Sequence, residues 1–269
     1  MTGYRDILVH LDGGERDDAR VAAAAALVRR FGGRLTGLFA RIENHGPSLV
    51  AHRASEAFEA AAHAAEEHFT AATRGLPSRY WRLAHGEPNH VLDETVICAR
   101  LSDLVVIGQH HAGKNAPAQL ADTVIKESGR PVLVIPAVGE YPVIGDAVMV
   151  AWNGGREATR AVHDALPFLE TAGSVEVVTV RTHSGAVGGE KRPPASVLDH
   201  LTTHGVRVSR EILAAEDIGI MDLLLSRAFD QGADLLVMGA HGGLHLPFAR
   251  GAGTRYILEH MTLPVLMSN

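Results

Sequence analysis

A glycine-rich stretch near the end of the chain carries the residues best suited to binding an anion. The short apolar run 235–238, typical of a strand buried on both faces, ends at Gly239 and leads into a loop with further glycines and a segment of helical spacing. Backbone N–H groups in such a loop can face an anion, the dipole of the following helix adds attraction, and glycine lets the backbone approach a phosphate. The stretch therefore fits a phosphate site, but a plain turn-rich connection fits it as well, and these residues alone favour the plain connection.

The histidines suggest a competing chemistry, metal binding. Three pairs lie close in sequence: His63 and His68, His110 and His111, and His241 and His245. A zinc site usually needs three or four converging ligands, and these spacings do not indicate one. We therefore expect no metal site. We expect His241 to contact a phosphate when it is protonated, which would make binding depend on pH.

Composition excludes several classes of protein. The formal net charge is −6 and no cluster of Lys and Arg stands out, so we expect no nucleic-acid surface. No run of about 18 apolar residues is present, and the first residues lack the pattern of a signal peptide. Cys98 is the single cysteine, in an apolar helical pattern, and we expect a buried core thiol. These features favour a cytoplasmic protein without a membrane partner.

The chain contains an internal repeat. DILVHLDGG (6–14) corresponds to AVMVAWNGG (147–155), DLVVIG (103–108) to DLLVMG (234–239), and SGRPVLVIP (128–136) to MTLPVLMSN (261–269). The matches come in the same order and at nearly constant offset, as expected for two copies of one fold. We therefore predict two domains, at residues 1–138 and 145–269.

Strands and helices are expected to alternate in each copy, which predicts parallel sheets with right-handed crossovers. In the first copy we expect strands at 7–11, 34–40, 79–84, 103–108 and 131–135, and helices at 17–31, 48–74, 88–100 and 117–127. In the second we expect strands at 148–152, 175–181, 207–213, 235–239 and 265–267, and helices at 157–170, 195–204, 218–231 and 251–261. The polar, breaker-rich stretch 184–194 predicts a mobile loop.

Ligands of open parallel sheets favour the carboxyl ends of the strands. Trp152 and Met238 end two such strands, so Asn153 and the glycine loop are expected to share one crevice. The Trp152 side chain can point into the core or to the lip of the crevice, and we expect the core. Asn153 precedes two glycines, where a turn also favours Asn.

With these motifs in view, essentially the whole chain resembles the universal stress protein family in its tandem two-domain form. The resemblance rests on the opening strands that end in Asp-Gly-Gly or Asn-Gly-Gly, on D-L-[VL]-V-[IM]-G, on the late glycine loop and on the closing P-V-L strand. It implies two flavodoxin-like (Rossmann-like) α/β domains, each a five-stranded parallel sheet with helices on both faces. It also implies that the two halves pair through their last strands as a pseudo-dimer; further oligomerisation is left open.

The resemblance implies an ATP site in the second copy. ATP-binding members carry G-x2-G-x9-G-[ST] after the fourth strand and an Asp after the first, and the adenine edge would lie near Ala151 and Val180. Carried over to this chain, the implied site comprises Ala151, Asn153, Val180, Met238, Gly239, His241, Gly242, Gly251, Ala252, Gly253 and Thr254. The cofactor is ATP, with Mg²⁺ left open, in the C-terminal half only.

This chain departs from the family pattern at three positions of that site. Eight residues, not nine, separate Gly242 from Gly251, and the hydroxyl position is Ala252, so a phosphate hydrogen bond is lost unless Thr254 supplies it. Asn153 takes the place of the Asp, which keeps an acceptor for ribose. Loss of a carboxylate near a polyphosphate eases charge repulsion.

The first copy has lost more of the pattern. Gly108 survives, but His111 takes the second glycine position and Ala118, followed by Gln119, the third. We expect these side chains to crowd the phosphate path and Asp122 to add negative charge nearby, and we expect Asp12 to be a turn residue. The first half should then hold no nucleotide and serve to stabilise the second.

Two classes of function remain open on the sequence. The family consists largely of binding proteins with weak or no ATPase activity, and no catalytic constellation is evident, so the leading hypothesis is a nucleotide-binding module of the stress response. The alternative is a nucleotide-free scaffold that acts by contact with an unknown protein partner. A third hypothesis is a different small ligand, in the first-half crevice or under the helix expected at 48–74.

Overall fold

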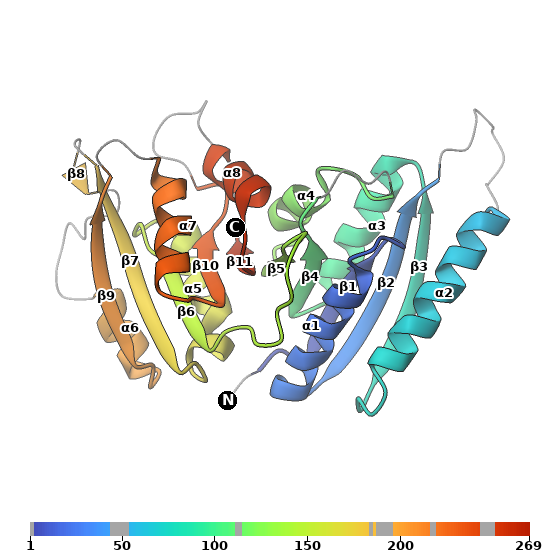
Figure 1. Cartoon of the computed structure of the whole chain (residues 1–269), viewed down its shortest axis with the longest axis horizontal. Coiled ribbons are helices and arrows are strands. Elements are labelled where there is room, and N and C mark those ends of the chain that lie inside the picture. Colours follow the sequence, from blue (N-terminus) through green and yellow to red (C-terminus); the bar gives the residue numbers. More distant parts are fainter. Residues whose placement is uncertain are drawn as a thin grey trace. The chain divides into compact units, whose positions relative to one another are not determined.

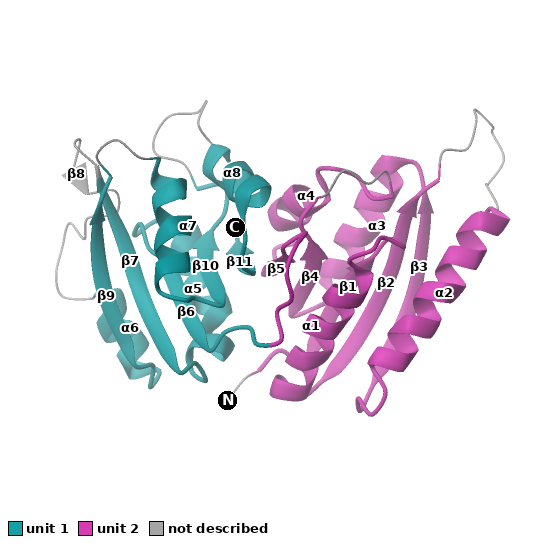
Figure 2. Cartoon of the chain, in the orientation of Figure 1, with its two compact units in different colours: residues 1, 143–269 teal, residues 2–142 magenta. Residues whose placement is uncertain are grey.

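The computed structural model describes residues 3–43, 54–110, 115–182, 185–186, 196–215, 219–242 and 251–269. The chain divides into two compact units (Figure 2). In chain order, we call the part that ends at Pro142 the first unit (magenta, unit 2 in the key of Figure 2) and Val143 to Asn269 the second unit (teal, unit 1 in the key). Each unit is a parallel sheet with helices against it, and we describe each by itself.

The first unit contains five parallel strands in the order β3-β2-β1-β4-β5 (Figure 1). Helices α1 and α2 pack together, as do α3 and α4, so each pair extends over the sheet as one layer. The strands are β1 (Asp6–Leu11), β2 (Arg34–Ile42), β3 (Arg79–Gly86), β4 (Leu104–Gly108) and β5 (Val132–Ile135). The helices are α1 (Asp17–Phe31), α2 (Glu56–Ala72), α3 (Pro88–Arg100) and α4 (Leu120–Glu127).

The second unit repeats this topology, with parallel strands in the order β9-β7-β6-β10-β11. Its strands are β6 (Ala147–Ala151), β7 (Ser174–Thr182), β9 (Val208–Ala214), β10 (Leu235–Gly239) and β11 (Val265–Ser268), with the short β8 (Gly185–Ala186) antiparallel to β7. Its helices are α5 (Arg156–Leu169), α6 (Val197–Thr203), α7 (Ile220–Asp230) and α8 (Ala252–His260). The predicted fold class, α/β with flavodoxin-like sheets, is confirmed.

Strands β4, β5 and β10 are buried on both faces, as their continuous apolar runs predicted. Leu104 to Ile107 and Val132 to Ile135 are at most 1% exposed, and Leu235 to Val237 are fully buried. Such runs exclude water from the sheet and leave ligand access mainly at the strand ends. Cys98 is buried as predicted, and burial raises the pKa of its thiol.

In the first unit, two predicted helices begin later than expected. The helix expected at 48–74 begins at Glu56, because the Ser55 hydroxyl caps it by accepting the Phe58 N–H at 3.0 Å. Residues 48–53 lie outside the described part. The helix expected at 117–127 begins at Leu120, after a turn in which the Leu120 N–H donates to the Pro117 carbonyl. Of the loop expected at 184–194, the described residues are those of β8, which are strand.

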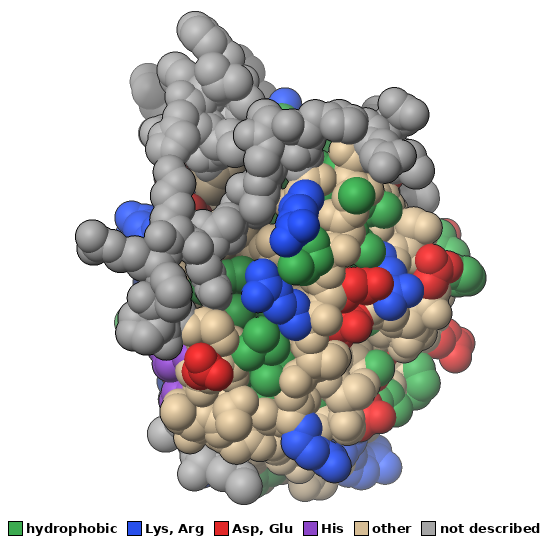
Figure 3. Space-filling view, turned by 90° about the vertical axis from the view of Figure 1, so that its left-hand side faces the viewer, with side chains coloured by type: hydrophobic (Ala, Val, Ile, Leu, Met, Phe, Trp, Pro, Cys, Tyr) green, Lys and Arg blue, Asp and Glu red, His purple; other side chains and the backbone are tan. Residues whose placement is uncertain are grey.

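The surface mixes side chains of different kinds on the face shown in Figure 3, where basic, acidic and hydrophobic side chains are interspersed. Among the described helices, none combines the length and the apolar character needed to cross a bilayer.

A pair of glycines in the first unit tests how tightly the turns are packed. Gly33 (φ 103°) precedes β2, and a Cβ added there would lie 2.3 Å from the Arg5 carbonyl oxygen, whereas Gly75 (φ 84°) has open space around it. We predict that Gly75→Ala lowers the free energy of unfolding by about 1 kcal/mol, the cost of a left-handed Cβ, and that Gly33→Ala lowers it at least about twice as much. Urea titration measures both; equal losses would show that the Arg5 backbone yields easily.

Candidate functional site

A cavity of about 200 Å³ lies at the carboxyl ends of β6, β7 and β10 in the second unit. It brings together eight of the eleven site residues predicted from the sequence: Ala151, Asn153, Val180, Met238, Gly239, Gly242, Gly253 and Thr254. The parallel sheet explains this convergence, because the ends of β6 and β10 are hydrogen-bonded neighbours, with Met238 paired to Ala151.

The other three predicted residues do not line the cavity but lie close to lining residues in the chain. His241 has left-handed backbone (φ 55°), and its N–H donates to the Thr254 hydroxyl at 2.8 Å. Gly251 is also left-handed, and a Cβ added there would lie 2.8 Å from His241 Nδ1. Ala252 is exposed and begins α8. Residues 243–250, including His245, lie outside the described part.

Gly239, which ends β10, and Gly242, in the loop after it, have different close neighbours. A Cβ added at Gly239 would lie 2.5 Å from the backbone nitrogen of Ala158, and one added at Gly242 would lie 2.9 Å from Glu157 Oε2. The first contact is with backbone, which cannot move aside cheaply. Glycine at 239 therefore lets β10 approach the first turn of α5.

One wall of the cavity is apolar. Val178 and Val180 of β7 face it, together with Met238 and, from α7, Met221 and Leu224. Such a slot suits the faces of a flat ring, whose transfer out of water the apolar contacts favour.

Trp152 lines the same cavity and is only partly buried, so the prediction that it lies in the core is wrong. β6 ends at Ala151, and Trp152 therefore stands where the sheet opens into the crevice. Its Nε1 is buried and makes no hydrogen bond within the described structure. An indole thus lies against the site with an unused donor.

Asn153 serves the turn and also lines the cavity. Its Oδ1 accepts the Gly155 N–H at 2.9 Å, which closes the turn between β6 and α5. Asn153 is exposed, and its side-chain amide group keeps further capacity to donate hydrogen bonds.

Sequence analysis missed Glu157, which lines the cavity from the first turn of α5. Asn153 stands where the family pattern has an Asp, but the cavity still has a carboxylate, because Glu157 Oε2 would lie 2.9 Å from a Cβ at Gly242. The signal available in the sequence was an acidic residue at a helix start, which is ordinary for its dipole and did not indicate a ligand site.

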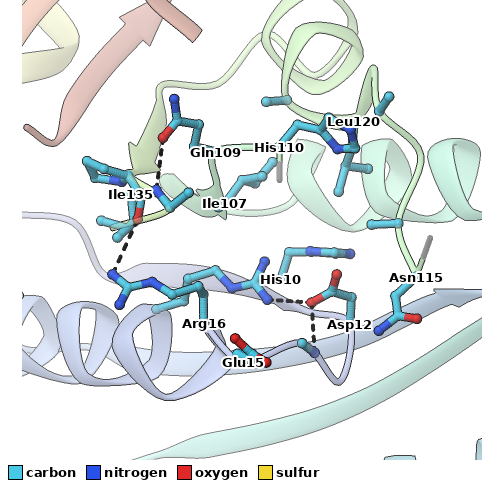
Figure 4. Close-up of a pocket in the computed structure, with 18 of the residues that line it drawn as sticks. His10, Asp12, Glu15, Arg16, Ile107, Gln109, His110, Asn115, Leu120 and Ile135 are labelled. Carbon is cyan, nitrogen blue, oxygen red and sulfur yellow. Dashed lines mark hydrogen bonds and ion pairs between the residues drawn. The ribbon is translucent and has the colours of Figure 1, made fainter. Parts of the chain in front are cut away.

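A larger cavity, of about 690 Å³, lies at the equivalent edge of the first unit. Figure 4 shows Asp12, Glu15 and Arg16, from the loop after β1, on one side and Gln109 and His110 opposite. Volume alone therefore favours the half in which we predicted no nucleotide.

The deep end of this first cavity holds a buried ion network. Arg20, 7% exposed, pairs with Asp12 at 2.5 Å and with Asp17. Asp17 also accepts the Gly13 N–H at 2.9 Å. A Cβ added at Gly108 would lie 2.8 Å from Arg20 Nη1, so the glycine that survives in this half makes room for a guanidinium.

The two carboxylates share one guanidinium and titrate as a pair. Burial opposes ionisation of Asp12, but attraction to Arg20 and His10 together with side-chain hydrogen bonds outweighs burial and lowers the pKa to about 2. Burial, with repulsion from Asp12, raises the pKa of Asp17 to about 6. Asp12 accepts the Gly14 N–H as well, in keeping with the turn predicted for it.

Two further expectations for the first half have different outcomes. Asp122 pairs with Lys126 at 2.5 Å along α4 and is not among the described residues that line the cavity, so its charge is not directed at the site. Ala118 does line the cavity. His111 lies outside the described part.

The internal repeat shows how the two sites diverged. At the offset that superposes Asp6–Gly14 on residues 147–155, Asp17 and Arg20 correspond to Ala158 and Ala161. His10 corresponds to Ala151 in the same way. One topology therefore carries an ionic network in the first unit and an apolar floor in the second.

No metal centre emerges from the histidines that the structure describes. His63 and His68 are exposed on α2 and lie near Glu67 and Asp18, at 3.3 and 3.4 Å. Within the described ranges, no group of three His, Cys, Asp or Glu side chains has a metal-binding arrangement.

The ion network predicts an unusual mutational series. We expect Arg20→Ala to lower the free energy of unfolding by about 3 kcal/mol or more, because it leaves two buried carboxylates uncompensated. The triple variant Asp12→Asn, Asp17→Ala, Arg20→Ala, which has the second unit's residues, should lose less than the single variant. Urea titration measures each; a triple variant less stable than Arg20→Ala would contradict this account of the network.

His10 predicts a loss of stability in acid. It is fully buried, donates from Nε2 to the Ala40 carbonyl at 3.1 Å, and burial followed by repulsion from Arg20 lowers its pKa from 6.5 to about 4. The folded state therefore resists protonation, and stability present above pH 6.5 is lost as the pH falls toward 4, by up to about 3 kcal/mol. His10→Gln should flatten this slope of the unfolding free energy, and exposed His63→Gln should not; an unchanged slope in His10→Gln would contradict the assignment.

Comparisons with known proteins agree with the fold. A structure of a universal stress protein from Archaeoglobus fulgidus DSM 4304 matches with a TM-score of 0.69 and 16% identity, over 98% of this chain and 97% of that one. A functionally unknown protein from Pseudomonas aeruginosa PAO1 matches with a TM-score of 0.64 and 14% identity, over 99% and 93%. At these identities the likeness shows a shared fold.

A shorter match is a universal stress protein in complex with cAMP, 20% identical, over 49% of this chain and 96% of that one, with a TM-score of 0.35. A search of curated protein sequences found no match. The sequence model of the universal stress protein family matches residues 3–136. The chain thus belongs to the universal stress protein family.

Proposed function

We propose that the second unit binds an adenine nucleotide, ATP in the first instance, and that the protein is a cytoplasmic nucleotide-binding module of the stress response. The observation that carries the proposal is the convergence on one cavity of eight residues that the sequence motifs predict for the site. Residues far apart in the chain, from Ala151 to Thr254, have to meet for such a site to exist.

The cavity offers a place for each part of a nucleotide. The apolar wall of Val178, Val180 and Met238 suits the base, beside the Trp152 indole. Gly239 and Gly242 supply backbone N–H groups without side chains in front of them, and α8 begins close by with Gly253 and Thr254, so its first N–H groups can face a phosphate.

Thr254 is a candidate for the hydroxyl that Ala252 lacks. It is 3% exposed, and its oxygen already accepts the His241 N–H, which leaves its own O–H to donate. We therefore propose that the Thr254 hydroxyl proton is donated to a phosphate, while its oxygen holds the end of the loop through His241.

The larger cavity favours a second candidate function, a different small ligand in the first unit. Its deep end is lined by His10, Asp12 and Arg20, where the second unit has Ala151, Asn153 and Ala161. A ligand there would meet an ion pair and an Arg side chain filling the space beside Gly108. This chemistry differs from a glycine cradle, so we do not assign it a nucleotide. The pairing of the halves through their last strands stays a prediction from the family resemblance.

The proposal is tested by calorimetric titration of the whole chain with ATP, ADP, AMP and cAMP in the presence of Mg²⁺. We predict one site per chain and a micromolar dissociation constant for at least one of them. Gly242→Val should weaken binding at least about tenfold, because a branched side chain fills the phosphate side of the cavity. The fold should survive, since the added Cβ meets the end of the Glu157 side chain and not backbone.

Ala118→Leu is the matched control, because it narrows the first cavity instead. Loss of binding in Ala118→Leu with Gly242→Val unaffected would move the site to the first unit. Absence of binding for all four nucleotides would leave the scaffold hypothesis, in which the protein acts by contact with another protein.

A further inference from the structure

We propose that Glu157 makes nucleotide binding depend on a divalent cation, with its carboxylate as the protein ligand of an ion that also binds the phosphates. The inference rests on the proposed function. It assigns a ligand role to Glu157, which no sequence motif marks as a binding residue. It also makes the bound form a cation–nucleotide complex, not the free nucleotide.

The carboxylate lies at the phosphate side of the cavity. Oε2 of Glu157 would be 2.9 Å from a Cβ at Gly242 and 3.6 Å from one at Gly155, so it lies between the start of α5 and the end of the β10 loop. The backbone of Glu157 itself packs on Gly239, with its carbonyl carbon 2.5 Å from an added Cβ. The side chain is thus anchored beside the N–H groups that would face a phosphate.

Among the described residues that line the cavity, none has a positive side chain that offsets this carboxylate. Of the described residues that line it, Glu157 is the one with an ionisable side chain. Its ion-pair partner in the described structure is Arg156, whose Nε is 3.6 Å from Oε1 and whose side chain is 79% exposed, against 25% for Glu157. An ion pair that is so exposed to water contributes little stabilisation.

A phosphate entering the cavity therefore meets a like charge. The repulsion is strong at short separation in a partly enclosed site, and a cation between the two groups converts it into attraction. Mg²⁺ is commonly bound by one or two carboxylates together with the phosphates of a substrate, and it retains several waters. In such a site the protein can supply as little as one carboxylate ligand, and the phosphates and waters supply the others.

The first unit provides an internal contrast. At the offset of the repeat, Glu157 corresponds to Arg16, which lines the first cavity and donates to the carbonyls of Pro136 and Gly139, at 3.3 and 2.6 Å. The same position at the start of the first crossover helix thus carries opposite charge in the two units. Only the second arrangement calls for a cation next to an anionic ligand.

The test measures nucleotide affinity with excess Mg²⁺ and with EDTA, in the whole chain carrying Trp81→Phe, so that Trp152 is the remaining indole and reports on the cavity. We expect Mg²⁺ to raise the affinity for ADP at least about tenfold in this background. In Glu157→Gln the affinity in EDTA should rise, and the gain from Mg²⁺ should fall to about twofold or less. Glu259→Gln, a neutralisation on α8 outside the described lining of the cavity, should behave like the parent.

The outcomes separate this inference from the function on which it rests. Binding with the same gain from Mg²⁺ in Glu157→Gln as in the parent would overturn the role of Glu157 and leave the nucleotide site standing. Binding by the parent that ignores Mg²⁺ would do the same. No binding in either condition, confirmed by calorimetry, would overturn the proposed function itself. Thermal melts of both Gln variants establish that the comparison is between folded proteins.

Discussion

The close approach between the end of β10 and the first turn of α5 is the constraint on which the second unit's site depends. Gly239 permits it, since any Cβ would meet the backbone of Glu157 and Ala158. The contact brings the turn after β6 against the loop after β10, and so places Asn153, Glu157 and Gly242 around one cavity. A glycine that looks like a phosphate residue in the sequence is therefore first a packing residue.

The two units show how one topology accommodates different chemistry. Both have the same strand order, and both have a cavity at the carboxyl ends of the strands, where parallel sheets leave backbone groups free of the ladder. In the first unit Gly108, the last residue of β4, accommodates the Arg20 guanidinium, which then requires Asp12 and Asp17 as counter-charges. In the second unit the corresponding helix positions are alanine and the floor is apolar. Divergence thus changed the charge in the crevice while the sheet stayed the same.

Much of the fold could be predicted because its signals are local. Buried parallel strands appear as short apolar runs such as 104–107 and 235–238, and α1 was predicted with its observed limits from its acidic start and the glycines that follow it. The start of α2 was missed because the cap is Ser55, which lies inside the range expected to be helix. Which residue caps a helix depends on where the chain turns out of the preceding segment, and the hydrophobic periodicity of the sequence does not contain that information.

The site was predicted where a motif specifies backbone, and missed where tertiary packing specifies side chains. Gly239, Gly242 and Asn153 follow from repeat and motif. Trp152 and Glu157 face the cavity because of the exact ending of β6 and the seating of α5 on β10, which no local pattern contains. Arg20 was overlooked although the repeat itself aligns it with Ala161. Comparing the two halves for exchanged charges, as well as for shared glycines, would have found both Arg20 and the Arg16-to-Glu157 exchange.

The central claim is that the nucleotide binds in the second unit, and photoaffinity labelling tests it most directly. The whole chain is irradiated with an azido-adenine nucleotide, digested, and the labelled peptide is identified by mass spectrometry, with unlabelled nucleotide as competitor. The account predicts competed label within Val143–Asn269, on peptides that contain Trp152, Met221 or Met238, which line the proposed base slot. Competed label on peptides that contain Asp12 or Gln109 would contradict it and assign the nucleotide to the larger cavity of the first unit.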